Sequence, residues 1–183
     1  MAVLAGLAVT AGVAVLLVAA VGPRDAAQPI SGDGSAIGLG TSSLSFFQER
    51  VRLHPEDVAA RLDLAQRYWD TGLTGLAALQ YTEAIRLDPA NGEARTGMAS
   101  VLFTQGHARE ALGEARQALA VDPSYPEALY QEGVILLRGL QRPAEAAVAL
   151  RAYLSAAPTG GHRAAVEAML EEIGALAAGT PSP

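Results

Sequence analysis

Residues 53–123 contain one kind of tripeptide three times, as Leu53-His54-Pro55, Leu87-Asp88-Pro89 and Val121-Asp122-Pro123. The three prolines are evenly spaced, and a fourth, in Ala156-Ala157-Pro158, comes one position later than this spacing requires. Because proline cannot continue a helix, regularly spaced prolines mark regularly repeated helix ends. A period of about 34 residues therefore predicts a chain built from stacked pairs of helices.

Each period also contains a glycine at its centre. Gly72 and Gly106 are one period apart, and each follows a run with helical apolar spacing. Glycine in this place is typical of a left-handed helix end. The third turn, residues 139–143, carries one extra residue, which accounts for the late position of the fourth proline. Pro143 suits the first turn of the helix that follows.

This pattern resembles the tetratricopeptide repeat family, with repeats at 58–91, 92–125 and 126–160. The resemblance implies an all-α fold, a right-handed superhelix of antiparallel helix pairs. Small residues at the family's Ala and Gly positions let paired helices approach closely. The family's large, small and aromatic positions, and its closing proline, fall on Leu64, Ala65, Tyr68, Ala77, Tyr81, Ala84 and Pro89; on Met98, Ala99, Leu102, Ala111, Ala115, Ala118 and Pro123; and on Gly133, Leu136, Ala146, Leu150, Tyr153 and Pro158.

Two positions depart from the family pattern. The family's Trp position holds Arg61, Arg95 and Leu129, and a large apolar position of the third repeat holds Glu132. A carboxylate that faces a core is costly. We therefore expect the first helix of the third repeat to be rotated or less covered than its counterparts.

Two further helices are expected beside the repeats, so that the folded domain covers residues 44–178. Residues 44–53 would form the second helix of an incomplete leading repeat. Residues 162–177 have apolar residues at helical spacing and glutamates opposite, which predicts a terminal capping helix. The tail, residues 179–183, is expected to be disordered.

The N-terminal part of the chain has a different composition. No charged residue lies between Ala2 and Gly22. As a helix, these residues would span roughly 31 Å, close to the hydrocarbon thickness of a bilayer. Residues 1–22 are thus interpreted as a transmembrane anchor, or alternatively as a cleaved signal peptide ending near Val18-Ala19-Ala20. Residues 23–43, rich in Gly and Ser, are expected to form a flexible linker.

Composition argues against several classes of function. The 13 basic residues are all Arg, against 19 acidic residues, and no Cys is present. An acidic chain lacks the basic surface that nucleic acids need. The three histidines lie in separate expected turns, so no metal site is predicted. No catalytic constellation is present, and we expect no enzymatic activity, no cofactor and no small-molecule substrate.

The resemblance implies a ligand surface along the concave face of the superhelix. Trp69, Phe103 and Leu137 recur with the period of the prolines and would form an apolar stripe there. The family's carboxylate clamp uses Lys and Asn, which are absent at these positions, so an amphipathic helix is the expected partner. Alternatively, the stripe is core, covered by the linker or the capping helix. The predicted groove residues are Leu62, Gln66, Trp69, Asp70, Thr96, Ser100, Phe103, Thr104, Tyr130, Val134, Leu137 and Arg138.

These features predict a membrane-anchored protein–protein interaction module in a bacterial cell membrane, single-pass, with its repeats outside the cytoplasm. Residues 123–173 also resemble the closing repeats of the tetratricopeptide subunits of bacterial c-type cytochrome maturation. That resemblance is carried by residues 122–129, 158–161 and 164–170, and implies an assembly chaperone or scaffold that presents apocytochrome. The alternative is a general scaffold for envelope or pilus assembly.

Overall fold

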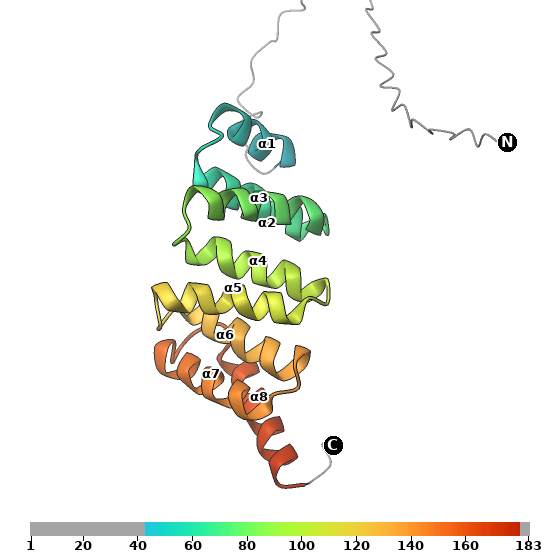
Figure 1. Ribbon diagram of the computed structural model, residues 1–183, viewed down its shortest axis with the longest axis vertical. Helices are drawn as coiled ribbons and strands as arrows, with labels where there is room; N and C mark the ends of the chain where they lie inside the picture. Colours follow the sequence, from blue (N-terminus) through green and yellow to red (C-terminus); the bar gives the residue numbers. More distant parts are fainter. Residues whose placement is uncertain (1–42, 180–183) are drawn as a thin grey trace, which may run out of the picture. The chain divides into compact units, whose positions relative to one another are not determined.

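The computed structural model describes residues 43–179 (Figure 1). Within this range all regular structure is helical, so the prediction of an all-α chain is confirmed there. The elements are α1 (Leu44–Leu53), α2 (Val58–Asp70), α3 (Thr74–Leu87), α4 (Gly92–Thr104), α5 (Ala108–Val121), α6 (Pro126–Val134), the π-helical turn η1 (Ile135–Gly139), α7 (Pro143–Ala156) and α8 (Arg163–Ala177).

The helices form three pairs, α2 with α3, α4 with α5, and α6 with α7, stacked one beyond the next (Figure 1). The first helices α2, α4 and α6 also contact one another from pair to pair. Helix α1 packs on α2, and α8 packs on α7. The core consists of two buried clusters, one between α1 and α4 and a second between α4 and α8.

The predicted membrane anchor and all but the last residue of the predicted linker lie outside the described residues. Within residues 43–179, none of the helices combines the length and the hydropathy needed to cross a membrane.

Residues with little or no side chain lie where paired helices cross. Ala65, Ala77, Ala99 and Ala111 have no exposed surface. At Gly133 in α6 even a methyl group has no room, because a Cβ atom built there would lie 2.7 Å from Leu150 Cγ of α7 and would overlap its Cδ2. The small residues of the family pattern therefore set the separation between the helices of a pair.

Polar side chains fix where the first helix of two repeats begins. The side-chain oxygens of Asp57 and Asn91 accept hydrogen bonds from the backbone N–H of Ala60 and Ala94, at 3.1 and 2.9 Å. These N-caps satisfy donors that the helix itself leaves free. The third repeat has no side-chain cap and instead places Pro126 in the first turn, where no N–H is needed.

The two arginines at the family's Trp position bind the preceding proline turn. Arg61 Nε donates to the carbonyl of Pro55 at 2.8 Å, and Arg95 Nε donates to the carbonyl of Pro89 at 2.9 Å. Arg95 is only 9% exposed and also pairs with Glu114 of α5 at 2.8 Å. A buried charge needs such a partner, so this departure from the family pattern is compensated locally.

The extra residue of the third repeat widens the helical turn that follows α6. In the first two repeats the chain closes by bonds from Leu73 N to Tyr68 O and from His107 N to Leu102 O, each five residues back. In the third, Arg142 N donates to Leu136 O, six residues back, at 2.8 Å. One residue inserted into a helical turn produces a π-helix, which is η1. The left-handed conformation of Gly72 and Gly106 is consequently adopted by Gln141, at φ 54°.

The expected rotation of the first helix of the third repeat is wrong. Leu129 and Gly133 are both buried in α6. Glu132, whose side chain is 15% exposed, accepts a hydrogen bond from Arg116 Nε of α5 at 2.7 Å. An ion pair therefore offsets the cost of the carboxylate, and α6 keeps its place between α5 and α7.

We predict that Gly133→Ala lowers the free energy of unfolding by about 1–3 kcal/mol, because its new methyl group would overlap the buried Leu150 side chain. Gly113→Ala is the matched control, since Gly113 also lies inside a helix but has open space around it. There, the better helix propensity of Ala should raise the unfolding free energy by up to about 1 kcal/mol. Equal effects of the two substitutions in urea unfolding would contradict the packing account.

Candidate functional site

A polar hollow of about 160 Å³ lies across the three first helices. Helix α4 is its centre and contributes half of the lining, while α2, α3 and α6 supply the rest. Since α4 contacts both α2 and α6, this is the face on which the sequence placed its groove. The lining residues are Gln66, Tyr81, Glu93, Thr96, Gly97, Ser100, Glu127 and Gln131.

Hydrogen bonds hold part of this lining in place. Gln131 Nε2 of α6 donates to Ser100 Oγ of α4 at 2.6 Å, and Ser100 Oγ donates to the carbonyl of Thr96 at 3.1 Å. On α2, Gln66 Nε2 donates to Asp70 Oδ1 at 2.7 Å. The amide side chains are therefore oriented before any partner arrives, which reduces the entropy lost on binding.

Tyr81 of α3 places a phenol group in the hollow. Its side chain is 4% exposed, and its ring lies against Gly97 of α4. A Cβ atom built on Gly97 would overlap the ring and lie 2.8 Å from the hydroxyl oxygen. Within residues 43–179, this hydroxyl makes no hydrogen bond. An uncommitted polar atom thus lies at the boundary between the core and the hollow.

The hollow is electronegative. Its lining contains Glu93 and Glu127 and no basic residue. Neither carboxylate forms an ion pair with any residue of the described range. Burial raises the pKa of Tyr81 to about 12, and the negative charges of Glu93 and Asp70 act in the same direction. The phenol therefore stays protonated at neutral pH.

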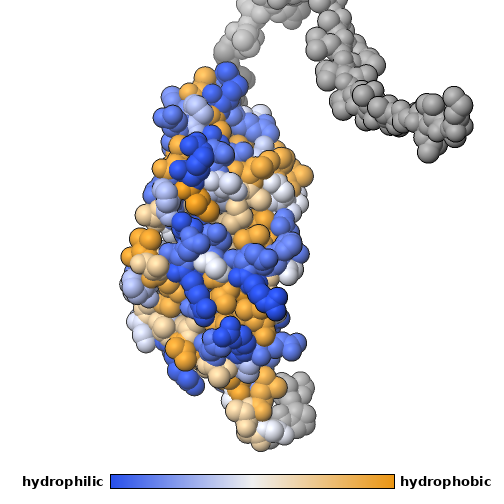
Figure 2. Space-filling view, in the orientation of Figure 1, coloured by the Kyte–Doolittle hydropathy of each residue, from blue (hydrophilic) through white to orange (hydrophobic). Residues whose placement is uncertain are grey.

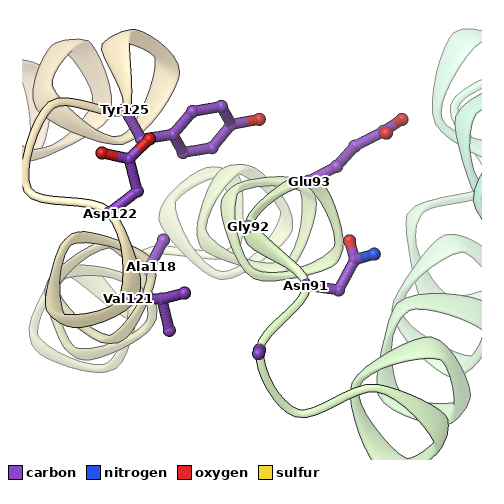
Figure 3. Close-up of a pocket in the computed structure, with 8 residues that line it drawn as sticks. Asn91, Gly92, Glu93, Ala118, Val121, Asp122 and Tyr125 are labelled. Atoms are coloured by element: carbon purple, nitrogen blue, oxygen red, sulfur yellow. The ribbon is translucent and has the colours of Figure 1, made fainter.

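A second hollow, of about 250 Å³, adjoins the first between the turns that follow α3 and α5. Figure 3 shows Glu93 and Tyr125 extending on the same side of the start of α4. The Tyr125 ring lies close to Gly92, where a Cβ atom would be 3.0 Å from Tyr125 Cε1. Glu93 lines both hollows, and Asp122 adds a further carboxylate to the second. The negative surface thus continues past the groove.

Helix α8 and the residue before it contact two of the groove positions predicted in the third repeat. The Tyr130 ring stacks on His162, just before α8, with centroids 4.0 Å apart. Arg138 Nη1 donates to Glu172 Oε1 of α8 at 2.6 Å. Val134 packs against the same core cluster. The Arg138 side chain nevertheless remains half-exposed.

The predicted continuous apolar stripe is not an open surface. Leu62 and Leu137 are only 8% and 7% exposed and belong to the core, so their assignment to an open groove is corrected. Trp69 and Phe103 are half-buried and pack on different core clusters. Gln66 and Asp70, with Thr104, are exposed, Ser100 is half-buried and Thr96 is 7% exposed. The open part of the groove is therefore polar and lies over the first two repeats and the start of α6.

Exposed apolar side chains do not supply another large docking surface. Among the described residues they are spread over several helices, with Leu79 on α3 and Val148 on α7 the most exposed, at 60% and 68%. On the face drawn in Figure 2, hydrophobic residues alternate with hydrophilic ones. Scattered apolar residues of this kind are normal on protein surfaces.

Sequence reasoning missed five residues of the hollow: Tyr81, Glu93, Gly97, Glu127 and Gln131. Glu93 and Glu127 are one period apart, at the second position of successive first helices, and this spacing could have identified them. Tyr81 was assigned to packing alone. Its second role depends on the absence of a side chain at Gly97, which only the structure brings beside it.

Known structures place this arrangement among helical repeat proteins. The first repeat domain of human RPAP3, solved by NMR, is 25% identical over 68% of this chain and 95% of that one, with a TM-score of 0.61. The first domain of Spaghetti (RPAP3), bound to the HSP90 peptide SRMEEVD, is 23% identical over 66% of this chain and 93% of that one, with a TM-score of 0.61. The protein TTC0263 of Thermus thermophilus is 20% identical over 69% of this chain and 71% of that one, with a TM-score of 0.62.

The sequence itself leads to the same family. No curated protein matches the chain. The profile of the tetratricopeptide repeat family, however, matches residues 46–95 and 96–161, which together exceed half of the chain. With helix pairs that repeat at the period of the prolines and small residues at their crossings, this chain belongs to the tetratricopeptide repeat family.

Proposed function

We propose that this protein binds a segment of a partner protein in the polar hollow formed by α2, α4 and α6. Tetratricopeptide repeats are protein–protein interaction modules, and this gives the general class. The observation that carries the site is the set of polar groups on one face, where hydrogen-bonded amides lie beside the Tyr81 hydroxyl and two carboxylates that are unpaired within the described chain. Such convergent polar groups fix the orientation and the identity of a ligand.

The proposed binding surface covers fewer repeats than the groove that the sequence predicted. The stack of α8 on the third repeat leaves Gln66, Ser100 and Gln131 as the centre of the accessible lining. An amphipathic helix laid along all three repeats would need an open apolar stripe, and Leu137 is too buried to contribute. A short segment that enters the groove over the first two repeats suits the geometry better.

Two finer features of the function rest on the sequence. The uncharged run of residues 2–22 supports a membrane tether, and a repeat domain outside the cytoplasm goes with it. The proposed part in c-type cytochrome maturation rests on the resemblance of residues 123–173 and remains a prediction, with envelope or pilus assembly as its alternative. The absence of enzymatic activity is likewise an expectation from the sequence.

We predict that Gln66→Arg weakens partner capture at least about ten-fold, because it adds a long cationic side chain at the edge of the hollow. Gln117→Arg is the matched control, since Gln117 is exposed on α5 away from this lining. Partners of the full chain would be identified by pull-down from a detergent extract and mass spectrometry. If the parent chain and both variants capture the same proteins equally well, the binding surface lies elsewhere.

A separate prediction concerns the tether. Because the uncharged run is long enough to span a bilayer, the full chain should sediment with membranes and resist extraction with alkaline carbonate. A chain lacking residues 2–22 is the control and should remain in the supernatant. Recovery of a carbonate-soluble mature form that begins near Val21 would show instead that the run is a cleaved signal peptide.

A further inference from the structure

We propose that the hollow receives a cationic side chain, an arginine or a lysine, from the partner segment. Glu93 and Glu127 would provide the opposite charge, and the Tyr81 hydroxyl oxygen would accept an N–H hydrogen bond from the bound cation. This proposal rests on the proposed function and specifies the chemistry of its ligand.

The first argument is the state of Tyr81. Its hydroxyl has no hydrogen-bond partner within the described chain although the side chain is 4% exposed. Among the described residues no fully buried side-chain oxygen or nitrogen lacks a partner, so this hydroxyl oxygen is accessible from the hollow. Because Gly97 has no side chain, the Tyr81 ring can pack against α4 with its hydroxyl at the edge of the hollow. A ligand that donates an N–H to this oxygen would replace water at an acceptor that no described residue uses.

The second argument is charge. The lining offers Glu93 and Glu127, with hydroxyl and amide groups between them, and contains no Arg. The nearest acidic residue of α2, Asp70, is already paired with Arg67 at 3.6 Å, outside this lining. An acidic peptide would meet two uncompensated carboxylates, and such like-charge contacts discriminate strongly against it. A cation is attracted by the same two groups.

The third argument is size. The volume of about 160 Å³ is below the roughly 300–1,000 Å³ that small-molecule sites occupy. A hollow of this volume suits one long side chain rather than a cofactor or a whole helix. Gln66 and Gln131 lie on the two helices, α2 and α6, that contact α4, and their amide groups can exchange hydrogen bonds with the backbone that carries this side chain.

The test uses a library of random peptides displayed on phage and selected on the immobilised full chain in detergent. Selected peptides should carry Arg or Lys at one fixed position. Affinities of one such synthetic peptide would then be measured by fluorescence anisotropy on the parent chain and its variants. Glu93→Gln combined with Glu127→Gln should weaken binding by about ten-fold or more, and added salt should weaken binding to the parent chain.

Tyr81→Phe tests the hydroxyl alone, because the ring and its contact with Gly97 remain. Its thermal midpoint should match the parent chain, while its affinity for the peptide should fall about three- to ten-fold. Glu171→Gln is the matched control for the charge change, since Glu171 is exposed on α8, away from the hollow. This variant should bind the peptide as the parent chain does.

The outcomes separate the inference from the proposed function. The cation site would be wrong if Gln66→Arg weakens the binding of selected peptides that have no Arg or Lys at a fixed position, or that have an acidic residue there. In that case the groove would still be the binding surface. Peptide binding that requires a divalent cation and disappears with EDTA would also overturn it. If Gln66→Arg does not weaken the binding of any selected peptide, the assignment of the binding surface to the groove, and with it the proposed function, is wrong.

Discussion

The close approach of helices at residues that lack a side chain determines the architecture of this chain. Gly133 in α6 admits Leu150 of α7 within one pair, and Gly97 in α4 admits Tyr81 of α3 between two pairs. A single methyl group at either glycine would overlap atoms that are almost completely buried. Because cores are packed to crystal-like density, such positions leave little freedom in how neighbouring helices are spaced.

The candidate site is a consequence of this packing. The contact that seats the Tyr81 ring against Gly97 also brings its hydroxyl to the surface formed by the first helices. The period of the repeat then places Glu93 and Glu127 on successive first helices of that surface. Core and binding surface therefore share residues, and a substitution at the shared contact should affect both stability and binding.

The sequence predicted the fold well because its determinants are local and periodic. The prolines, the glycine turns and the buried alanines all follow from residue type and spacing, and the profile of the family confirms the repeat. The groove was predicted less well. Spacing shows which residues occupy the same repeat position as Leu62 and Leu137, but the burial of these two leucines depends on neighbours distant in sequence. Likewise, the ion pair of Glu132 with Arg116 and the stack of Tyr130 on His162 depend on tertiary contacts.

A double-mutant cycle between Gly97 and Tyr81 tests most directly whether this contact fixes the spacing of the repeats. The unfolding free energy would be measured for Gly97→Ala, Tyr81→Leu and the double variant. Leucine removes the ring atoms that the new methyl group would meet. The cost of Gly97→Ala should therefore be smaller in the leucine background, by about 1 kcal/mol or more. Strictly additive effects would show that the two residues do not restrain each other and would contradict the account.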